Sequence, residues 1–210
     1  MGMHCGYPAV KDQALVQIAD AALADAARRS GKWLACKPGC SHCCVGVFSI
    51  NQLDAMRLRK GLAEMNVTDP ERAARIRARV QETVAKLSPD YPGDPVTGLV
   101  DDDDDSPEAS QRWDDFANDV PCPVLDPATG QCELYSSRPL LCRTFGPPVK
   151  SDENENDLTV CELCFEGATD DEVSSCEMHP DPDHLEDVIL EELEKTGATG
   201  NTIIAFALAR

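Results

Sequence analysis

The stretch Cys36-Lys-Pro-Gly-Cys40-Ser-His-Cys43-Cys44 decides how this chain is organised, because it places four thiols within nine residues. Its proline and glycine stiffen the loop and allow a positive φ angle. Closing so short a segment costs little conformational entropy, so one loop can direct several sulfurs at one ion. Free cysteines also occur as small buried apolar residues, but four of them in a polar loop argue against that interpretation. We therefore interpret the stretch as a metal-binding knuckle.

Three further cysteines follow at ten-residue intervals, at Cys122, Cys132 and Cys142. The segment from Cys122 to Tyr135 has the pattern of a β-hairpin, with Asp126-Pro127 and Gly130 at its turn. Seven thiols exceed one tetrahedral site, and Cys161 would complete two four-thiolate centres. The adjacent pair Cys43 and Cys44 is hard to direct at one centre, so one of the two would serve a second ion or a neighbouring iron. The predicted metal ligands are Cys36, Cys40, Cys43, Cys44, Cys122, Cys132, Cys142 and Cys161.

The remaining cysteines give weaker signals. Cys161-Glu-Leu-Cys164 is a separate C-x-x-C, Cys176 is isolated, and Cys5 stands beside His4 near the N-terminus. A thiol redox protein built on Cys161 and Cys164 would need a thioredoxin-like βαβ setting, which the sequence pattern lacks.

Composition sets the class of protein. The 210 residues are 42% hydrophobic, include 11 cysteines and carry a formal charge of −19, which disfavours nucleic acid or an anionic membrane surface as partner. No secretory signal precedes the first helical pattern, and the apolar run Ile203–Ala209 is too short to span a membrane. We therefore expect a cytoplasmic protein with reduced thiols, which favours metal coordination over a disulfide-rich module.

The charge is uneven along the chain, and this suggests its domain organisation. Residues 1–90 hold 13 bases and 9 acids, whereas residues 91–210 hold 6 bases and 29 acids. We predict N-terminal helices plus the knuckle over residues 1–90 and an acidic linker over 88–107. An acidic C-terminal part with the cysteine hairpin, over 108–210, would form one metal-binding unit with the first part. The five aspartates Asp101–Asp105 and the acidic loop Asp152–Asp157 fit hydrated surface rather than a cation site.

Helical periodicity dominates, so we expect a small, mainly helical α+β fold with the knuckle and one short hairpin. One amphipathic helix ends near Ser30-Gly31, and another begins at Asp69-Pro70-Glu71 and stops at Ser88-Pro89. A capping box of Ser49 and Gln52 would start a helix that ends at Gly61. Ser136 or Ser137 would cap a short helix carrying Cys142, and Asp183 the last helix. Arg72, Arg75, Arg77 and Arg79 fit a solvated helix face better than a phosphate site.

The sequence resembles the YkgJ-like cysteine-cluster family, whose CxxxCxxCC signature is associated with chelation of zinc or iron. The resemblance spans about residues 34–145 and rests on the knuckle and on a downstream signature. That signature is Cys122-Pro-Val-Leu, Gly130-Gln-Cys132, Tyr135, Arg138-Pro139 and Cys142-Arg143. The resemblance implies a zinc or iron centre on the shared cysteines. Some relatives, notably flagellin lysine methylases, are associated with an iron–sulfur cluster. No Gly-rich loop follows a strand pattern here, so we do not carry the methylase activity over.

Two classes of function follow. In the first, the chain is a metal-binding protein that holds zinc or an iron–sulfur cluster, such as 4Fe–4S, without catalysing a reaction. In the second, it is an iron–sulfur enzyme with redox or peptide-modifying chemistry, whose acidic half contacts a protein or peptide partner. Cys36-x3-Cys40-x2-Cys43 also matches the radical S-adenosylmethionine motif, but that chemistry normally needs a barrel of alternating strands and helices. Arg138 and Arg143 would donate hydrogen bonds to thiolates or bind an anionic substrate, or else balance local acids.

Overall fold

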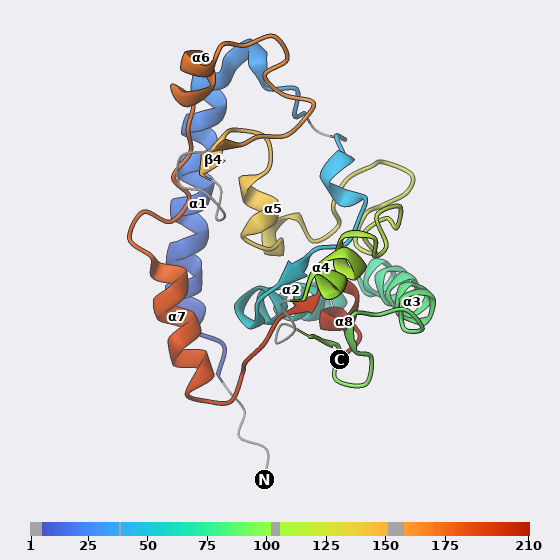
Figure 1. The fold of residues 1–210 in the computed structure, drawn as a ribbon. Coiled ribbons are helices and arrows are strands. Elements are labelled where there is room, and N and C mark those ends of the chain that lie inside the picture. The colour runs from blue at the N-terminus through green and yellow to red at the C-terminus, as the bar shows by residue number, and fades with distance from the viewer. Residues whose placement is uncertain (1–5, 38, 102–105, 151–157) are drawn as a thin grey trace. The chain divides into compact units, whose positions relative to one another are not determined.

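The computed structural model describes residues 6–37, 39–101, 106–150 and 158–210 (Figure 1). The predictions for His4 and Cys5, for Asp102–Asp105 and for the loop Asp152–Asp157 lie outside these residues. The chain divides into two compact units, each built from separate stretches. Unit 1 comprises Met1–Tyr7, Gly39–Pro139 and Glu192–Arg210, and unit 2 comprises Pro8–Pro38 and Leu140–Glu191. We describe each unit by itself.

The fold is α+β and mainly helical, as predicted, with short antiparallel strands. In unit 1 the helices are α2 (Gln52–Thr68), α3 (Pro70–Leu87), α4 (Pro107–Asp114) and α8 (Ile204–Leu208), with 3-10 turns at His42–Cys44 and Tyr135–Ser137. The strands of this unit are β1 (Ser49–Ile50), β2 (Gly93–Asp94), β3 (Leu99–Val100) and β6 (Thr202–Ile203).

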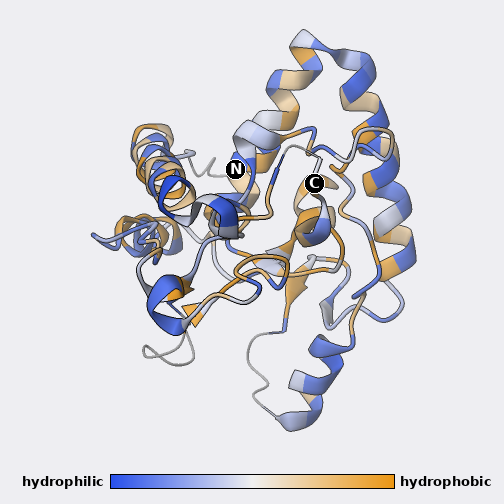
Figure 2. Ribbon diagram, turned by 90° about the horizontal axis from the view of Figure 1, so that it is seen from above, coloured by the Kyte–Doolittle hydropathy of each residue, from blue (hydrophilic) through white to orange (hydrophobic). Residues whose placement is uncertain are grey.

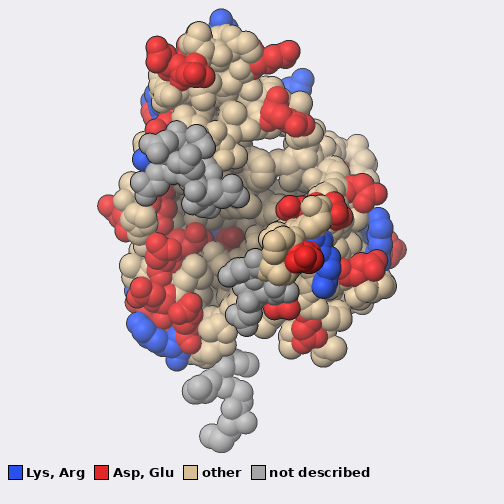
Figure 3. Space-filling view, in the orientation of Figure 1, with Lys and Arg blue, Asp and Glu red and all other residues tan. Residues whose placement is uncertain are grey.

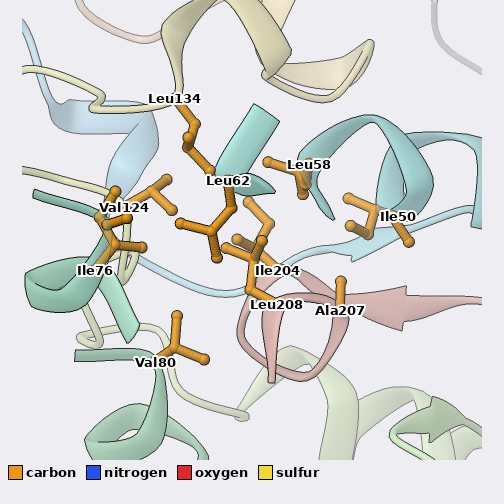
Figure 4. Close-up of a cluster of buried hydrophobic side chains, with 12 residues drawn as sticks. Ile50, Leu58, Leu62, Ile76, Val80, Val124, Leu134, Ile204, Ala207 and Leu208 are labelled. Carbon is orange, nitrogen blue, oxygen red and sulfur yellow. The ribbon is translucent and has the colours of Figure 1, made fainter. Parts of the chain in front are cut away.

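The C-terminal apolar run organises the core of unit 1. Its first residue, Ile203, forms β6 together with Thr202, and β6 pairs antiparallel with both β1 and β3 in a four-stranded sheet of order β1-β6-β3-β2. The rest forms α8, which packs against α2 and α3. Figure 4 shows the resulting core, in which Leu58 and Leu62 of α2 meet Ile76 of α3 and Ile204 of α8. Burying these side chains contributes roughly 1.5–3 kcal/mol for each large aliphatic residue.

Helix α2 begins and ends elsewhere than the sequence pattern predicts. The cap is Asn51, whose side chain accepts a hydrogen bond of 3.0 Å from the backbone N–H of Asp54. The predicted capping box of Ser49 and Gln52 is therefore wrong. The helix also continues through Gly61 to Thr68. A Cβ at Gly61 would lie 2.5 Å from Cβ of Ser137, so this glycine serves close packing rather than termination.

Helix α3 confirms its predicted start and apolar stripe. Asp69 accepts a hydrogen bond from the backbone N–H of Arg72, and Pro70 occupies the first turn, where no N–H is needed. Its buried residues Ala73, Ile76, Val80 and Leu87 face the core. Within 88–107, which the sequence predicts as a linker, the structure has the strands β2 and β3.

Unit 2 contains one long helix and several short elements. These are α1 (Ala9–Ser30), a 3-10 turn at Gly31–Trp33, α5 (Leu141–Thr144), β4 (Val149–Lys150), β5 (Leu158–Thr159) and α6 (Asp170–Ser174). Helix α7 (Leu185–Glu194) begins in unit 2 and ends in unit 1. The end of α1 at Ser30-Gly31 is confirmed, with Gly31 at φ 49°. Arg29 of α1 donates a hydrogen bond of 2.8 Å to the carbonyl of Glu177, which ties the helix to the 175–177 turn.

The predicted caps of helices α7 and α5 are wrong. Helix α7 is capped by Asp181, which accepts hydrogen bonds from the N–H groups of Leu185 and Glu186 at 2.9 and 2.8 Å, and not by Asp183. Helix α5 starts at Leu141 without a side-chain cap, while Ser136 and Ser137 belong to a separate 3-10 turn. Asp181 is one turn further from α7 than a standard cap, so a local sequence rule favours the nearer Asp183.

The helices carry hydrophobic residues beside hydrophilic ones, as Figure 2 shows. Acidic side chains dominate over basic ones on the face drawn in Figure 3, in keeping with the net charge of −19. Among the described residues, no helix is long and apolar enough to cross a membrane.

Candidate metal centre

In unit 1 the knuckle is joined to the hairpin by backbone pairing. The N–H of Cys122 donates a hydrogen bond of 2.8 Å to the carbonyl of Cys44, and the N–H of Gly46 donates one of 3.0 Å to the carbonyl of Val120. Between these two bonds, Val45 and Pro121 form an antiparallel bridge. Residues almost eighty positions apart are thus held side by side, and two of the predicted ligands lie on the paired segments.

The predicted hairpin is confirmed. Leu125 and Cys132 form an antiparallel bridge, and the N–H of Gly130 donates a hydrogen bond of 2.9 Å to the carbonyl of Asp126. Gly130 has φ 67°, and a Cβ there would lie 3.2 Å from the carbonyl oxygen of Gly39. A larger residue would be strained by the backbone conformation and crowded by the start of the knuckle. The hairpin therefore returns Cys132 beside Cys122, with its turn against the Gly39 end of the knuckle.

A buried glutamate anchors the hairpin to helix α3. The side chain of Glu133 is 5% exposed and accepts a hydrogen bond of 2.8 Å from Nε of Arg72. It also pairs with Arg79, whose Nε donates to the carbonyl of Pro123 at 2.9 Å. Arg72 and Arg79, which the sequence predicts to lie on a solvated helix face, thus bind the hairpin through Glu133. Sequence reasoning missed Glu133, although an acid among apolar and cysteine residues was an available signal.

Four thiols of unit 1 lie within electrostatic range of one another: Cys43, Cys44, Cys122 and Cys132. The Cys43 and Cys44 side chains hydrogen-bond to each other, which lowers the pKa of Cys43 to about 6 and raises that of Cys44. The first proton of this pair leaves readily because the remaining S–H stabilises the thiolate. The two adjacent sulfurs therefore lie within hydrogen-bonding reach of each other.

The hairpin thiols respond to burial and to backbone donors. Burial raises the pKa of Cys122 to about 12, and backbone N–H groups of Val124 and Leu125 that hydrogen-bond to this cysteine act in the opposite direction. Burial also raises the pKa of Cys132, which the hydrogen bond from the backbone N–H of Leu134 opposes. Burial keeps these thiols protonated in the absence of a cation, whereas the backbone N–H donors stabilise the thiolate form. Both cysteines are therefore suited to lose their protons when a cation binds.

Arg138 supplies positive charge to two of these four thiols. Its guanidinium charge helps lower the pKa of both Cys43 and Cys132. The side chain is buried and lies over the ring of Tyr135, with 3.8 Å between Cζ and the ring centroid. This position favours thiolates at the site.

Of the other predicted ligands, Cys40 belongs to unit 1, whereas Cys36, Cys142 and Cys161 belong to unit 2 together with Cys164 and Cys176. None of the ten described cysteines forms a disulfide bond. Cys36 is exposed, Cys142 and Cys161 are half-buried, and Cys164 and Cys176 are buried. Arg143 belongs to this unit too, and its Nη1 lies 2.6 and 2.8 Å from the two carboxylate oxygens of Asp20 in α1. The described contacts of Arg143 therefore agree with the interpretation, considered from the sequence, that this arginine balances the charge of a nearby acid.

Among the described residues, no three His, Cys, Asp or Glu side chains already stand in an arrangement that encloses a metal ion. The backbone of unit 1 nevertheless brings four sulfurs from two distant segments into mutual electrostatic range. Metal binding by these four sulfurs would require rotation of the side chains and loss of the thiol protons. This is usual for sites that form only when the metal binds.

Comparison with known proteins adds a family. No curated protein and no solved structure matches the chain. A family model named CxxCxxCC, described as a "putative zinc- or iron-chelating domain", matches residues 35–164, which is more than half of the chain and includes all eight predicted ligands. The chain therefore belongs to this family of cysteine-cluster domains.

Proposed function

We propose that unit 1 binds a zinc ion or an iron–sulfur cluster through the thiolates of Cys43, Cys44, Cys122 and Cys132. The observation that carries the proposal is the electrostatic coupling of these four thiols, which come from two segments joined by the hydrogen bond between Cys122 and Cys44. Cys40 belongs to the same unit and lies three residues before Cys43. The family to which the chain belongs supports chelation of zinc or iron.

The donor set decides the class of metal. Four thiolates are soft ligands that suit zinc and iron–sulfur clusters, whereas calcium and magnesium require oxygen donors. Zinc or iron at the site would replace the protons of the thiols, and Arg138 would offset part of the resulting negative charge. The N–H groups of Val124, Leu125 and Leu134 would then donate to metal-bound sulfur, which fixes its orientation.

Metal binding would join two segments that are distant in the sequence, the knuckle and the hairpin. A metal held by Cys43 and Cys132 would lock the knuckle to the hairpin, and Glu133 already ties that hairpin to α3. The binding free energy would thereby become folding free energy for the knuckle and hairpin. We propose this as the main role, with a protein or peptide partner for the acidic surface as an additional expectation.

The radical S-adenosylmethionine form of the enzyme alternative finds less support. All strands of the described residues pair antiparallel, in sheets of order β1-β6-β3-β2 and β4-β5. A radical S-adenosylmethionine enzyme would instead be expected to show parallel strands alternating with helices. Cys36 also belongs to a different compact unit from Cys40 and Cys43.

The test is an anaerobic preparation of the full chain, analysed for zinc, iron and acid-labile sulfide together with its visible spectrum. Zinc without sulfide supports the ion, and iron with sulfide and a charge-transfer band supports the cluster. The variant Cys122→Ser/Cys132→Ser should lose the metal of unit 1, whereas Cys176→Ala should keep it. A wild-type chain that takes up neither zinc nor iron, even on reconstitution under reducing conditions, would overturn the proposal.

A further inference from the structure

We propose that the buried ion pair of Asp54 and Arg57 in α2 positions Arg138 beside the thiols of unit 1. The inference deepens the proposed function and rests on it, because it names the residues through which the helical core sets the charge at the thiols. Arg57 acts on the site only through Arg138, as a positioning residue and not as a ligand.

Asp54 and Arg57 are both almost completely buried in α2. Each side chain is 4% exposed, and Nη1 of Arg57 pairs with a carboxylate oxygen of Asp54. Removing two charges from water is costly, and apolar residues of similar volume often replace such a pair without loss of stability. Stability therefore does not by itself account for two charges on a buried face of this helix.

The pair lies on the face of α2 that packs against the 3-10 turn Tyr135–Ser137. Asp54, Arg57 and Gly61 follow one another at spacings of three and four residues, which places them along one side of the helix. Gly61 closely approaches the last residue of the turn. Arg57 reaches the residue after the turn, because its Nη1 lies 3.5 Å from the carbonyl oxygen of Arg138. The ion pair therefore extends from the helix to the backbone of Arg138.

This contact holds the backbone of Arg138 where little conformational freedom remains. Arg138 is 6% exposed, and the carbonyl of a buried residue needs a donor. The following Pro139 restricts Arg138 to an extended conformation, with φ −62° and ψ 149°. Fixing the carbonyl of such a residue also fixes the direction in which its side chain leaves the backbone. Asp54 orients Arg57 in turn, because it pairs with the same Nη1.

The side chain of Arg138 carries the effect to the sulfurs. Its guanidinium lies over the ring of Tyr135, with 3.8 Å between Cζ and the ring centroid. The hydrogen bond with Cys44 is the main cause that lowers the pKa of Cys43, and the charge of Arg138 adds to it. Burial raises the pKa of Cys132, and the charge of Arg138 acts in the opposite direction. A positive charge beside thiolates offsets the negative charge that they bring to a metal, so its position affects metal affinity.

Arg59 offers a matched control within the same helix. Its Nε donates a hydrogen bond of 2.8 Å to the carbonyl of Ala207 in α8, so it too joins α2 to a distant backbone carbonyl. Ala207 belongs to the apolar core and not to the turn before Arg138. Replacing Arg59 therefore removes a contact of the same chemistry without touching the path to the thiols.

The test measures metal binding by the full chain, reduced and freed of metal, through anaerobic titration with Co²⁺ and competition for Zn²⁺ with a chromophoric chelator. Asp54→Leu/Arg57→Met removes both charges together and so leaves no lone buried charge. We expect this variant to bind Zn²⁺ roughly tenfold more weakly, as is typical when a residue that orients a metal site is lost. The thiolate-to-cobalt absorption should move to longer wavelength, because the thiolates lose a nearby positive charge. Arg59→Met should change neither quantity.

A double-mutant cycle separates positioning from a general structural effect. Arg138→Met should weaken Zn²⁺ binding at least as much as Asp54→Leu/Arg57→Met does. Combining the two changes should weaken binding no further, because the pair acts through Arg138. Additive losses would show that the pair acts by another route and would overturn the inference.

The outcomes also separate this inference from the proposed function. A wild type that binds neither Co²⁺ nor Zn²⁺ overturns the proposed function, and this role of Arg57 with it. A wild type that binds Zn²⁺ with an affinity that Asp54→Leu/Arg57→Met leaves unchanged overturns the inference alone.

If the double variant does not fold, Arg57→Lys decides instead. Lysine keeps the positive charge beside Asp54 but lacks the planar guanidinium that also reaches the carbonyl of Arg138. Arg57→Lys should weaken Zn²⁺ binding in the wild-type background and have no effect in the Arg138→Met background. Wild-type affinity in Arg57→Lys would contradict the inference.

Discussion

Gly61 in the middle of α2 faces Ser137 so closely that a Cβ at position 61 would lie 2.5 Å from the Cβ of Ser137. Glycine within a helix normally costs about 1 kcal/mol relative to alanine. Here the cost is offset because the missing side chain lets the turn that precedes Arg138 pack directly on α2. Arg138, whose charge acts on Cys43 and Cys132, directly follows that turn.

Gly61→Ala should therefore destabilise the protein despite its better helix propensity. Overpacking of this kind costs typically 1–3 kcal/mol, and the propensity gain offsets only part of it. Urea unfolding of the metal-free chain measures the change. Adding Ser137→Gly should restore most of the loss, and an equal loss with and without that second change would show that the contact is not the cause.

Glu133→Gln should destabilise unit 1 by about 1–2 kcal/mol, because it removes the charge that Arg72 and Arg79 share while both arginines keep partial access to solvent. It should also weaken zinc binding, since Cys132 is the neighbouring residue. Equilibrium unfolding and competition with a chromophoric chelator measure the two effects.

The exposed pair of Lys60 and Glu64 in α2 provides the control for this substitution. Glu64→Gln should change stability by no more than about 0.5 kcal/mol, as is usual for solvated pairs four residues apart on a helix. Equal effects of Glu133→Gln and Glu64→Gln would contradict the anchoring role of Glu133.

In the metal-free, reduced chain, Cys43 should be the first thiol of unit 1 to react with iodoacetamide. Its pKa is lowered to about 6, so the thiolate forms as pH rises through about 6 and is largely present at pH 7, whereas Cys122, with its raised pKa, stays protonated. Peptide mass spectrometry over pH 5–9 gives the rates. Cys44→Ala removes the S–H donor and should move the onset of Cys43 alkylation to higher pH; an unchanged onset would refute the pairing.

Removal of metal should loosen the knuckle and hairpin while the helical core persists. The contacts among α2, α3 and α8 are apolar and need no ion, whereas the linkage from Cys43 to Cys132 would depend on one. Hydrogen exchange with and without a chelator should show faster exchange at Cys122 and Glu133 and little change in the middle of α2. Uniform acceleration across unit 1 would instead mean that the core itself requires metal.

Asp181→Ala should destabilise the start of α7 by about 0.5–2 kcal/mol, because two N–H groups lose their acceptor. Asp183→Ala, at an exposed position two residues away, is the matched control and should have little effect. Thermal unfolding monitored by circular dichroism compares the two. A larger effect at Asp183 would favour the cap that the sequence pattern predicts.

The accuracy of the predictions follows the range of the interactions involved. The start of α3 and the hairpin turn at Asp126 and Gly130 depend on neighbours within a few residues, and both were predictable. Gly61 lies inside α2 and closely approaches Ser137, which is 76 positions away, so a local rule that treats glycine as a helix terminator gives the wrong end. In the sequence, the C-terminal run Ile203–Ala209 is recognisable only as a short apolar segment. Its place in the core of unit 1 follows from the pairing of β6 with β1 and β3, which the local sequence does not predict.

The sequence by itself determined that this is a mainly helical chain with a cysteine knuckle of the zinc- or iron-chelating class, because thiol chemistry and short spacings are local properties. Only the tertiary structure decided how the cysteines are grouped. It places Cys40, Cys43, Cys44, Cys122 and Cys132 in unit 1, and Cys36, Cys142, Cys161 and Cys164 in unit 2. Cys36 and Cys40 are four residues apart, yet a backbone hydrogen bond joins Trp33, just before Cys36, to Phe165 within unit 2, and another joins Cys44 to Cys122 within unit 1. Such contacts join residues almost eighty or more positions apart, and no local pattern encodes them.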